Sequence, residues 1–506
     1  MPLHQRLPVR LAPLLPYFAF FLLVLGGKLL LISRYGSLTP MHDEWDGIGY
    51  RLYRLYVQGQ LGWGDMFGAF NEHRIVTTRV YELLLLKLNG GVWNPVLQMT
   101  LNAVLHAGVL AGLLFGLRQT CPERQRGLLL VFALILLGLP LAVENTLVGF
   151  QSQFYFLMLF SFTSLWAFAT APALSRRWWL GLACGLLALI SMASGALSLL
   201  VGAIFLLLRW WRAGGDRRVL LTAALLAVLA GIAIALTPSV HTYDPVRAHS
   251  LADFGIALLK VFSWPADVGL LHISYLPLLL LAFFLFAVLI HLPLLRFLCM
   301  QLRTPPQADD PSWLLFLGGL WVLSQLLAIC YSRASIPVTS RYVDLFSLGL
   351  LLNAICLLRR EPPVQAGPPQ ASLVHVWMLL IAACLFWYGG HRVLPALAQK
   401  LVFSPVAEAN VRAYLSTHDY SILQNNEYPF IPYAEPGFLK KMLDDPALVS
   451  VLPASLAPAN AARESVLVVT LITHLQGLAV LLLAAGGVLL GLYTASRQPR
   501  AATFRD

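Results

Sequence analysis

The sequence LAPLLPYFAFFLLVLGGKLLLI, from Leu11 to Ile32, decides the fold because it is an uninterrupted apolar run of membrane-spanning length. A transmembrane helix needs roughly 20 apolar residues. Arg6 and Arg10 precede the run, and the basic flanks of a span stay on the cytoplasmic side. We therefore expect the N-terminus inside and the chain from Thr39 onward outside. The run is too long for the core of a signal peptide, so it is predicted to be an uncleaved first span.

The composition places the rest of the chain in lipid as well. Of 506 residues, 58% are hydrophobic and only 12% are charged, and the mean hydropathy is +0.73. A soluble domain is close to half apolar and a quarter charged. Inside a bilayer every backbone polar group must be bonded internally, which restricts the spans to helices or a closed barrel. The apolar runs are continuous rather than alternating, and this selects helices.

The charge and the cysteines argue against two other classes of protein. The formal net charge is +11, but the Lys and Arg residues lie in short loops between apolar runs, as membrane topology alone requires. Nucleic-acid binding is therefore not expected. The six cysteines fall almost entirely inside apolar runs or beside basic loops, so neither a disulfide framework nor a zinc site is predicted.

The basic loops predict an all-α bundle of about twelve transmembrane helices with both termini inside. One stretch, residues 178–208, leaves two interpretations open, because it is too long for one ordinary span and short for two. Arginines flank both of its ends, which favours a tight hairpin turning near 191–195 over a single tilted helix. The other expected spans cover 11–32, 95–117, 128–141, a segment ending near 170, 220–236, a segment ending near 295, 314–330, 345–358, 374–388 and 466–493.

Three regions are expected along the chain. Residues 1–391 form the main transmembrane region, and its first external loop, 34–94, carries short helices over 46–58 and 77–88 that suit the membrane interface. Residues 392–463 form a small external region with helices over 406–415 and 436–443. Residues 464–506 hold the last span and a cytoplasmic tail. An amphipathic helix over 251–262 is predicted in another external loop.

Three carboxylates stand within four positions at the start of the first external loop, in the sequence MHDEWDG at 41–47. They are Asp43, Glu44 and Asp46. Each of them alone could be an ordinary helix-start residue, and Asp43 could cap the helix that follows. Three together repel one another, more strongly at a low-dielectric membrane edge. Such a cluster favours binding of a cation or tuning of a proton acceptor.

Two arginines lie on an expected external turn, YSRASIPVTSRYVD, where the positive-inside bias disfavours them. They are Arg333 and Arg341, and Tyr342 follows the second. The planar guanidinium fork suits phosphate, so the turn is a candidate phosphate site. The alternative is that these arginines pair with the acidic cluster or reach lipid headgroups.

Two further groups of polar residues are candidates for substrate binding. The group in the first loop could bind a substrate, or could cap a second interfacial helix. The group in a short external turn could hydrogen-bond ligand hydroxyls, or could mark the polar ends of helices. The candidates are Glu72, His73 and Arg74 in the first loop, and Glu144, Gln151 and Gln153 in the turn.

Acids and arginines at one membrane face, beside many apolar helices, fit the transfer of a sugar from a membrane carrier. Nucleotide sugars are absent outside the cytoplasm, so the sugar must arrive on a carrier such as a polyprenyl phosphate. Arginines would neutralise the departing phosphate, while a carboxylate takes the proton of the attacking hydroxyl. The transition state resembles that of glycoside hydrolysis, so nearby negative side chains help.

The chain resembles the GT-C superfamily of polytopic glycosyltransferases in its many helices, its first external loop and the acidic motif MHDEWDG after the first span. The turn TSRYVD at 339–344 is similar to external Arg-Tyr turns in related bacterial proteins. The resemblance implies Asp43 as the catalytic base, with Glu44 or Asp46 as the less favoured choices.

The same resemblance implies an inverting enzyme of the bacterial inner membrane whose active site faces the periplasm or exterior. The implied donor is a polyprenyl-phosphate sugar, and the acceptor is a cell-envelope glycan, a lipopolysaccharide or a protein. The C-terminal external region is small compared with that of oligosaccharyltransferases, which leaves the use of a divalent cation open.

Two other classes compete with the transferase. A transporter or flippase of a lipid-linked sugar keeps ionisable groups near the middle of the membrane and often shows repeated halves. Here such groups are few, with Lys28 the clearest, and the acids gather at one face. A non-catalytic assembly or polymerase-type protein of envelope glycan synthesis would share the topology without needing an acidic pair after the first span.

Overall fold

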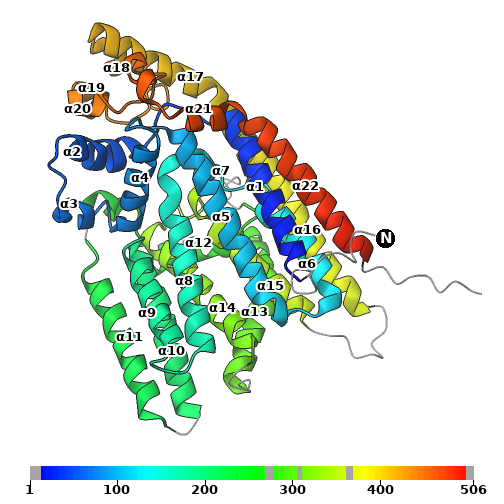
Figure 1. Cartoon of the computed structure of the whole chain (residues 1–506). Coiled ribbons are helices and arrows are strands. Elements are labelled where there is room, and N and C mark those ends of the chain that lie inside the picture. Colours follow the sequence, from blue (N-terminus) through cyan, green and yellow to red (C-terminus); the bar gives the residue numbers. More distant parts are fainter. Residues whose placement is uncertain are drawn as a thin grey trace, which may run out of the picture.

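The computed structural model describes residues 13–212, 215–238, 240–267, 277–304, 310–359 and 369–496. Regular structure across these residues is helical, and no β-strand occurs among them. A single backbone bridge between Phe70 and His73 closes a tight turn. The chain is therefore the all-α bundle that its apolar runs predict (Figure 1).

Ten helices of the described residues are long and apolar enough to cross a membrane, so the chain is a multi-pass membrane protein. One large hydrophobic cluster fills the space between them. The ten are α1 (Leu15–Tyr35), α5 (Pro95–Leu117) with η3 (Arg118–Thr120), η5 (Gly149–Gln151) with α8 (Ser152–Thr170), η6 (Ala193–Gly195) with α10 (Ala196–Arg212), α11 (Arg217–Ala235), α13 (Pro277–Arg303), α14 (Ser312–Ser332), η9 (Ser340–Tyr342) with α15 (Val343–Leu358), the run from α16 (Pro369–Tyr388) into α17 (Leu394–Thr417), and α22 (Leu475–Ser496).

The prediction of about twelve spans exceeds this count because two of the expected segments form helices that are too short to cross a membrane. These are α6 (Arg126–Gly138) and α9 (Arg176–Leu189), with 13 and 14 residues. At 1.5 Å per residue each is about 20 Å long, less than the hydrocarbon thickness of about 30 Å.

Residues 178–208 form two helices. This confirms the prediction of a hairpin and excludes the alternative of a single tilted helix. The helix α9 ends at Leu189, and α10 begins at Ala196 and packs against it. A Cβ on Gly195 would overlap the backbone of Ala188, so the return of the chain requires glycine. The turn is also tied to the first external loop, because Val76 N donates to Ile190 O at 2.8 Å.

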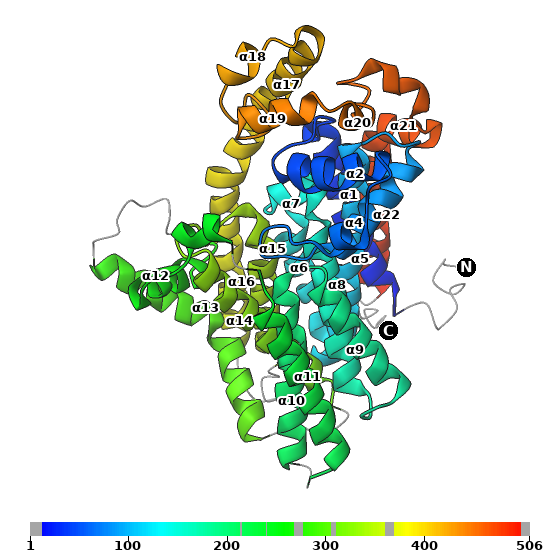
Figure 2. The ribbon, with the colours of Figure 1, turned by 90° about the vertical axis from the view of Figure 1, so that its left-hand side faces the viewer.

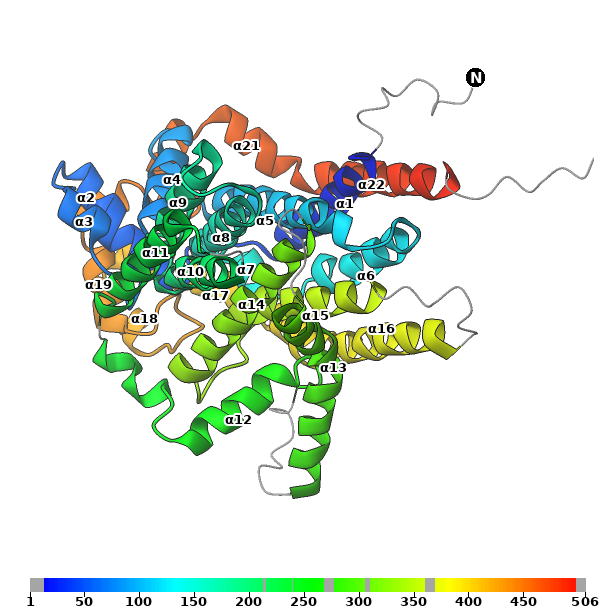
Figure 3. The same ribbon diagram turned by 90° about the horizontal axis from the view of Figure 1, so that it is seen from below.

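The first and last spans pack closely through small residues. A Cβ added to Gly26 would lie 2.8 Å from Leu483 Cγ, and one added to Gly486 would lie 2.8 Å from Leu23 Cγ. The two helices run side by side in Figures 1 and 3. Glycine at a helix crossing lets backbones approach in a membrane, where van der Waals packing drives association. The predicted span 466–493 is divided at His474 into α21 (Val466–Thr473) and α22.

The prediction that a helix ends near residue 388 is wrong. The helix continues without interruption from Leu373 to Thr417, over 45 residues. It does not end at the two glycines, because the wider π-helical turn η10 (Gly389–Val393) carries the chain from α16 into α17. A helix of this length is about 68 Å long, so it projects well beyond a bilayer core of about 30 Å.

A second hydrophobic core lies outside the bundle and joins two segments far apart in the sequence. The first loop contributes Trp45, Tyr53 and Trp93, and the region 392–463 contributes Ile431 and Leu448 among others. Figure 2 shows the two segments as one layer at the top of the molecule. The segment 392–463 is therefore packed onto the first loop. Its layer holds η2 (Glu44–Tyr53), α2 (Arg54–Val57), α3 (Trp63–Phe67), α4 (Val76–Leu88), α18 (Ser421–Gln424), α19 (Pro436–Leu443), α20 (Pro446–Val449) and η11 (Pro458–Arg463).

The predicted short helices of the external segments are confirmed near 46–58, 77–88 and 436–443, although the first is π-helical over most of its length. The predicted helix over 251–262 is also confirmed as α12 (Leu251–Phe262), which lies at the side of the bundle against α13 and α14 (Figures 2 and 3). Three further short helices are η4 (Glu123–Gln125), α7 (Val143–Leu147) and η7 (His241–Val246).

A buried carboxyl group ties this layer to α5. Glu82 of α4 is fully buried, and its Oε2 accepts hydrogen bonds from Gln98 Nε2 and, at 3.0 Å, from the Tyr53 hydroxyl. Burial raises the pKa of Glu82 from 4.5 to about 8. Between about pH 4.5 and pH 8 the folded protein therefore keeps a proton on Glu82 that the unfolded chain has released. The free energy of unfolding falls as the pH rises through this range.

Glu82→Gln is expected to flatten the pH dependence of stability. A proton difference of one per molecule changes the free energy of unfolding by about 1.4 kcal/mol per pH unit, and the amide removes that difference. The melting temperature of the purified protein in detergent should rise at pH 8 and change little at pH 5. Exposed Glu427 supplies the control, and Glu427→Gln should leave the pH dependence as in the wild type. If Glu82→Gln and the wild type show the same pH dependence of the melting temperature, Glu82 does not carry the raised pKa.

Candidate functional site

A cavity of about 280 Å³ lies where the first loop, 34–94, meets the ends of several spans. Its charged lining comes from four places along the chain: the start of η2, the turn at 70–73, α7, and the segment from the end of α14 to η9. Apolar side chains of α8, α14 and α15 line the rest, together with Met192 in the turn before α10. The charged and titratable residues are Asp43, Glu72, His73, Glu144, Arg333 and Arg341.

Asp43 stands at the cap position of η2, yet its side chain makes no capping hydrogen bond. Among the described residues, no hydrogen bond or ion pair reaches the Asp43 carboxylate. The cap interpretation is therefore wrong, and the carboxylate is directed into the cavity with the arginines. Burial raises the pKa of Asp43 above its ordinary value, while the nearby Arg341 and His42 oppose that rise. A carboxylate with a raised pKa is a better proton acceptor.

The backbone at His42 directs the chain into the site. Its φ of 55° is left-handed, a conformation that a residue other than glycine seldom adopts. Two contacts from the region 392–463 hold it there: His42 N donates to Pro432 O at 2.9 Å, and His42 Nε2 lies 2.5 Å from the Tyr428 hydroxyl. Burial lowers the pKa of His42 to about 4, so this imidazole is neutral at physiological pH. The segment 392–463 thus fixes the residue beside Asp43.

Each arginine of the cavity is paired with a glutamate. Arg341 Nη2 lies 2.5 Å from Glu144 Oε1, and Arg333 Nη2 is bonded to Glu72 Oε1. These pairs are partly buried, with 35% and 20% of the Arg341 and Glu144 side chains exposed. The proposed pairing of Arg333 and Arg341 with the cluster at 43–46 is therefore not observed; their partners are other acids of the same cavity. Arg51 is the residue that pairs with Asp46, at 2.9 Å.

The turn at 70–73 presents Glu72 and His73. Phe70 and His73 exchange backbone hydrogen bonds of 2.8 and 3.0 Å, and Asn71 takes the left-handed conformation at φ 51°, which asparagine tolerates. Burial acts to raise the pKa of Glu72, but His73 and Arg333 outweigh it and hold the pKa below its usual value. Burial lowers the pKa of His73. Glu72 is therefore ionised and available to anchor Arg333.

Three oxygen atoms of the lining have no hydrogen-bond partner within the part of the chain that the structure describes. They are Glu72 Oε2, Gln153 Oε1 and Thr339 Oγ1, and each is buried. An unsatisfied buried polar atom costs about 1–3 kcal/mol, and such atoms in a native structure need an explanation. Together they form a set of acceptors suited to a ligand rich in hydroxyl groups.

Glu44 was predicted as a second catalytic carboxylate, but it does not line the cavity. Its side chain is 1% exposed, and its oxygens accept from Met41 N at 2.6 Å and Gly149 N at 2.8 Å. Burial raises the pKa of Glu44 to about 7. Glu44 therefore joins the start of η2 to η5, which holds Asp43 in place without reaching the cavity itself.

Three other predicted residues also lie outside the lining. Asp46 pairs with Arg51 at the surface, and Arg74 donates to Leu236 O at 3.1 Å. Gln151 is buried, and its Oε1 accepts from Gln153 Nε2 at 3.5 Å. The predicted residues that the cavity does bring together are Asp43, Glu72, His73, Glu144, Gln153, Arg333, Arg341 and Tyr342.

Sequence reasoning missed several polar lining residues. Asn71, Ser194, Gln325 and Thr339 line the cavity, and Gln325 Nε2 donates to Ser194 O at 3.0 Å. Thr339 opens the same TSRYVD turn that drew attention to Arg341, so the motif itself contained that signal. Ser194 lies in the predicted hairpin turn. Nothing in the sequence marks Gln325, which is one polar residue within a long apolar span.

The site does not fit a divalent cation held by protein side chains. Within the described ranges, no group of three or more His, Cys, Asp or Glu residues is arranged to hold a metal ion. In the cavity itself, Glu72 and Glu144 are occupied by arginines. No step of the chemistry below is therefore routed through a metal.

The chain matches no protein-family model, no curated protein and no solved structure. Its class is therefore defined by its own fold and site. It is a multi-pass all-α membrane protein with a cavity that combines two arginines, their glutamates and a carboxylate that no hydrogen bond or ion pair reaches within the described ranges.

Proposed function

We propose that the protein is a membrane glycosyltransferase that moves a sugar from a polyprenyl-phosphate carrier to an acceptor outside the cytoplasm. One observation carries the proposal: Asp43 lines the same cavity as Arg333 and Arg341, although these residues are almost 300 positions apart in the sequence. A proton acceptor and two phosphate-binding groups in one partly apolar cavity are what this reaction requires. The resemblance to the GT-C superfamily agrees with the proposal.

In the proposed reaction the acceptor hydroxyl oxygen attacks the anomeric carbon of the donor sugar. The bond from that carbon to the phosphate oxygen breaks, and its electron pair leaves with the polyprenyl phosphate. The hydroxyl proton passes to Asp43. Arg341 and Arg333 stabilise the charge that develops on the departing phosphate, the type of contribution that is often the largest in group transfer. Attack from the side opposite the phosphate inverts the anomeric centre.

The remaining lining residues suit the two halves of such a donor. The unpartnered oxygens of Glu72, Gln153 and Thr339 can accept hydrogen bonds from sugar hydroxyls. An isoprenoid chain can lie against the apolar part of the lining, which includes Phe154, Ile329 and Ile336. Ile336 is 49% exposed, so this apolar part reaches the surface of the bundle. We place the protein in a bacterial inner membrane with the cavity facing the periplasm or exterior.

The proposal is tested by reconstituting the purified protein in vesicles with a polyprenyl-phosphate sugar labelled in the sugar. Release of free polyprenyl phosphate and transfer of label to a membrane-derived acceptor fraction are expected together. Turnover without release of the carrier phosphate would overturn the proposed chemistry. A panel of carriers bearing different sugars would then identify the donor.

The rate of transfer is expected to fall at acid pH because only ionised Asp43 accepts a proton. Burial places the pKa of Asp43 above its usual value, so activity is lost as the pH falls through that raised pKa. The acid limb of kcat/KM should therefore lie above pH 4, the region of an ordinary aspartate. If a detergent assay finds no acid limb above pH 4, the assignment of Asp43 as the catalytic base is contradicted.

One observation favours a second candidate, a transporter or flippase of a lipid-linked sugar. Lys28, His106 and Asp344 are ionisable residues buried within spans, where transporters keep groups that couple to their substrates. The two candidates differ in product. A flippase moves the intact lipid-linked sugar between leaflets, whereas the transferase releases free carrier phosphate, which the vesicle assay measures directly.

A further inference from the structure

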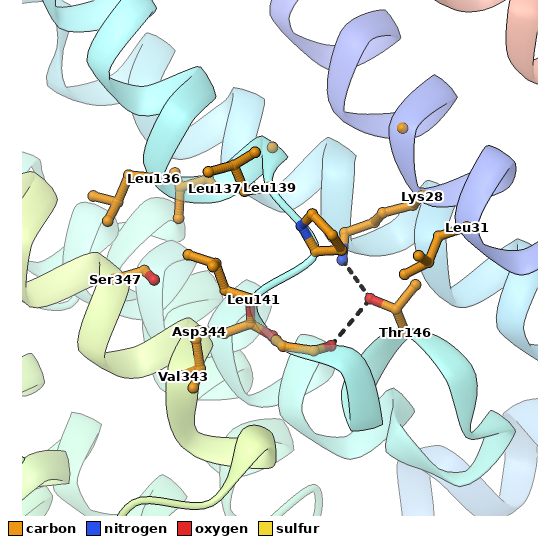
Figure 4. A pocket seen from close by; sticks show the side chains of 14 residues that line it. Lys28, Leu31, Leu136, Leu137, Leu139, Leu141, Thr146, Val343, Asp344 and Ser347 are labelled. Atoms are coloured by element: carbon orange, nitrogen blue, oxygen red, sulfur yellow. Dashed lines mark hydrogen bonds between the residues drawn. The ribbon is translucent and has the colours of Figure 1, made fainter. Parts of the chain in front are cut away.

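A group of buried polar side chains continues from the cavity into the bundle along α7. Lys28 of α1 is 9% exposed, and its Nζ donates to Thr146 Oγ1 at 3.0 Å, while Thr146 Oγ1 donates to Ala142 O at 3.2 Å. Figure 4 shows the Lys28 side chain reaching from α1 to Thr146. Asp344 of α15 accepts a hydrogen bond of 2.8 Å from Asn145 Nδ2. Lys28 and Asp344 line the same small pocket.

Three consecutive residues of α7 are joined to the segment 340–344 and to Lys28. Glu144 carries the ion pair to Arg341, and its backbone N–H donates to Ser340 Oγ at 3.0 Å. Asn145 Nδ2 donates to Arg341 O at 2.9 Å as well as to Asp344. Thr146 is joined to Lys28. The short helix therefore connects the buried charges of α1 and α15 to the arginine of the cavity.

The space between the buried charges is too small for a substrate. The pocket that Lys28, Thr146, Asp344 and Ser347 line has a volume of about 10 Å³, room for no more than one water molecule. These residues do not line the larger cavity. Binding of the donor therefore does not explain why two ionisable groups are buried here.

Buried charges within spans are costly, and they persist where they serve a function. A helix of five residues such as α7 is not stable alone, because helices shorter than about 12 residues are marginal in water. Its position must therefore come from the bonds to neighbouring elements. His106 adds to this grouping: its ring stacks on Tyr155 at 4.3 Å, and the Tyr155 hydroxyl donates to Asn145 O at 2.7 Å.

We propose that Lys28 and Asp344 are positioning residues that hold α7 and η9, and through them the Glu144–Arg341 pair, in the geometry that binds the carrier phosphate. Neither residue contacts the substrate. The inference rests on the proposed function only in taking the carrier phosphate as the ligand of Arg341. Removing one charge leaves the other buried and uncompensated, whereas removing both does not.

The test compares three variants of the full-length chain with the wild type: Lys28→Met, Asp344→Asn and the double variant. Hydrogen exchange is measured at peptides covering 143–147 and 340–344, and affinity for a polyprenyl phosphate is measured by thermal shift in detergent. Each single variant should exchange faster at both peptides and bind the polyprenyl phosphate at least about tenfold more weakly. The double variant should be milder than the worse single variant, because the buried charges are removed together.

Asn353→Leu is the matched control. Asn353 is a buried polar residue on α15 as well, hydrogen-bonded to Leu294 N at 2.9 Å, and it lies away from α7. This variant should lower the melting temperature without changing phosphate affinity, so it separates positioning from stability.

Two outcomes overturn the inference: unchanged exchange at α7 in both single variants, or weaker phosphate binding in Asn353→Leu equal to that in Lys28→Met. Failure of the wild type to bind the polyprenyl phosphate would instead overturn the proposed function, and the exchange measurement would still decide whether Lys28 and Asp344 hold α7 and η9.

Discussion

Asp43→Asn is expected to slow sugar transfer about 10²- to 10⁴-fold, the usual contribution of a positioned general base. The amide fills the same volume, so the cavity and the start of η2 should keep their structure. It cannot accept the proton of the acceptor hydroxyl, so the loss should appear in kcat, with the KM for the donor near the wild-type value. The measurement is the initial rate of carrier-phosphate release in vesicles, at saturating donor.

Asp46→Asn is the matched control, because Asp46 belongs to the same acidic motif but pairs with Arg51 at the surface. Its rate should stay within about twofold of the wild type, because neither Asp46 nor Arg51 lines the cavity and an ion pair with a half-exposed arginine contributes little. Equal losses in the two variants would show that the motif acts through its total charge. Wild-type turnover in Asp43→Asn would exclude Asp43 as the base.

Arg341→Met is expected to lower kcat/KM for the lipid-linked donor about 10²- to 10³-fold, comparable to the removal of one preorganised donor at a developing negative charge. Methionine keeps part of the side-chain volume and removes the charge that neutralises the departing phosphate. The single variant also leaves Glu144 unpaired. The double variant Arg341→Met with Glu144→Gln therefore separates loss of phosphate binding from the effect of an unpaired carboxylate.

Arg51→Met removes an arginine of the external layer whose ion pair lies outside the cavity, and its kcat/KM should be close to that of the wild type. Affinity for a polyprenyl phosphate, measured separately, should fall in Arg341→Met and in the double variant alike. If the double variant recovers wild-type kcat/KM, the arginine serves only to pair with Glu144, and the phosphate assignment fails.

Much of the bundle could be predicted from sequence because each span is a continuous apolar run and its length is set by the bilayer. The hairpin at 190–195 could be predicted because arginines flank both ends of the stretch. Counting α6 and α9 as spans was the error, because helices of 13 and 14 residues are shorter than a bilayer core although their apolar composition resembles that of a span. The continuation of α16 into α17 was hidden by two glycines, which usually end a helix and here lie in a π-helical turn.

The site could be predicted in its residue types but not in its pairings. An unusual charge at a membrane edge marks Asp43, Arg333 and Arg341, and all three line one cavity. Which acid of the cluster reaches the cavity depends on the left-handed backbone of His42, and the contacts that hold it come from residues 428 and 432. Pairings over such distances leave no local pattern. Glu144 and Gln151 looked equivalent in sequence, yet only Glu144 meets an arginine.

The core shared by the first loop and the C-terminal external region also determines the order of events during synthesis. The loop emerges from the ribosome early, but Ile431 and Leu448, which cover Trp45 and Trp93, are made near the end. The surface around Asp43 is therefore complete only after the segment 392–463 has been synthesised and has packed onto the first loop. A chain cut before residue 392 therefore leaves Trp45 and Trp93 without the side chains that cover them.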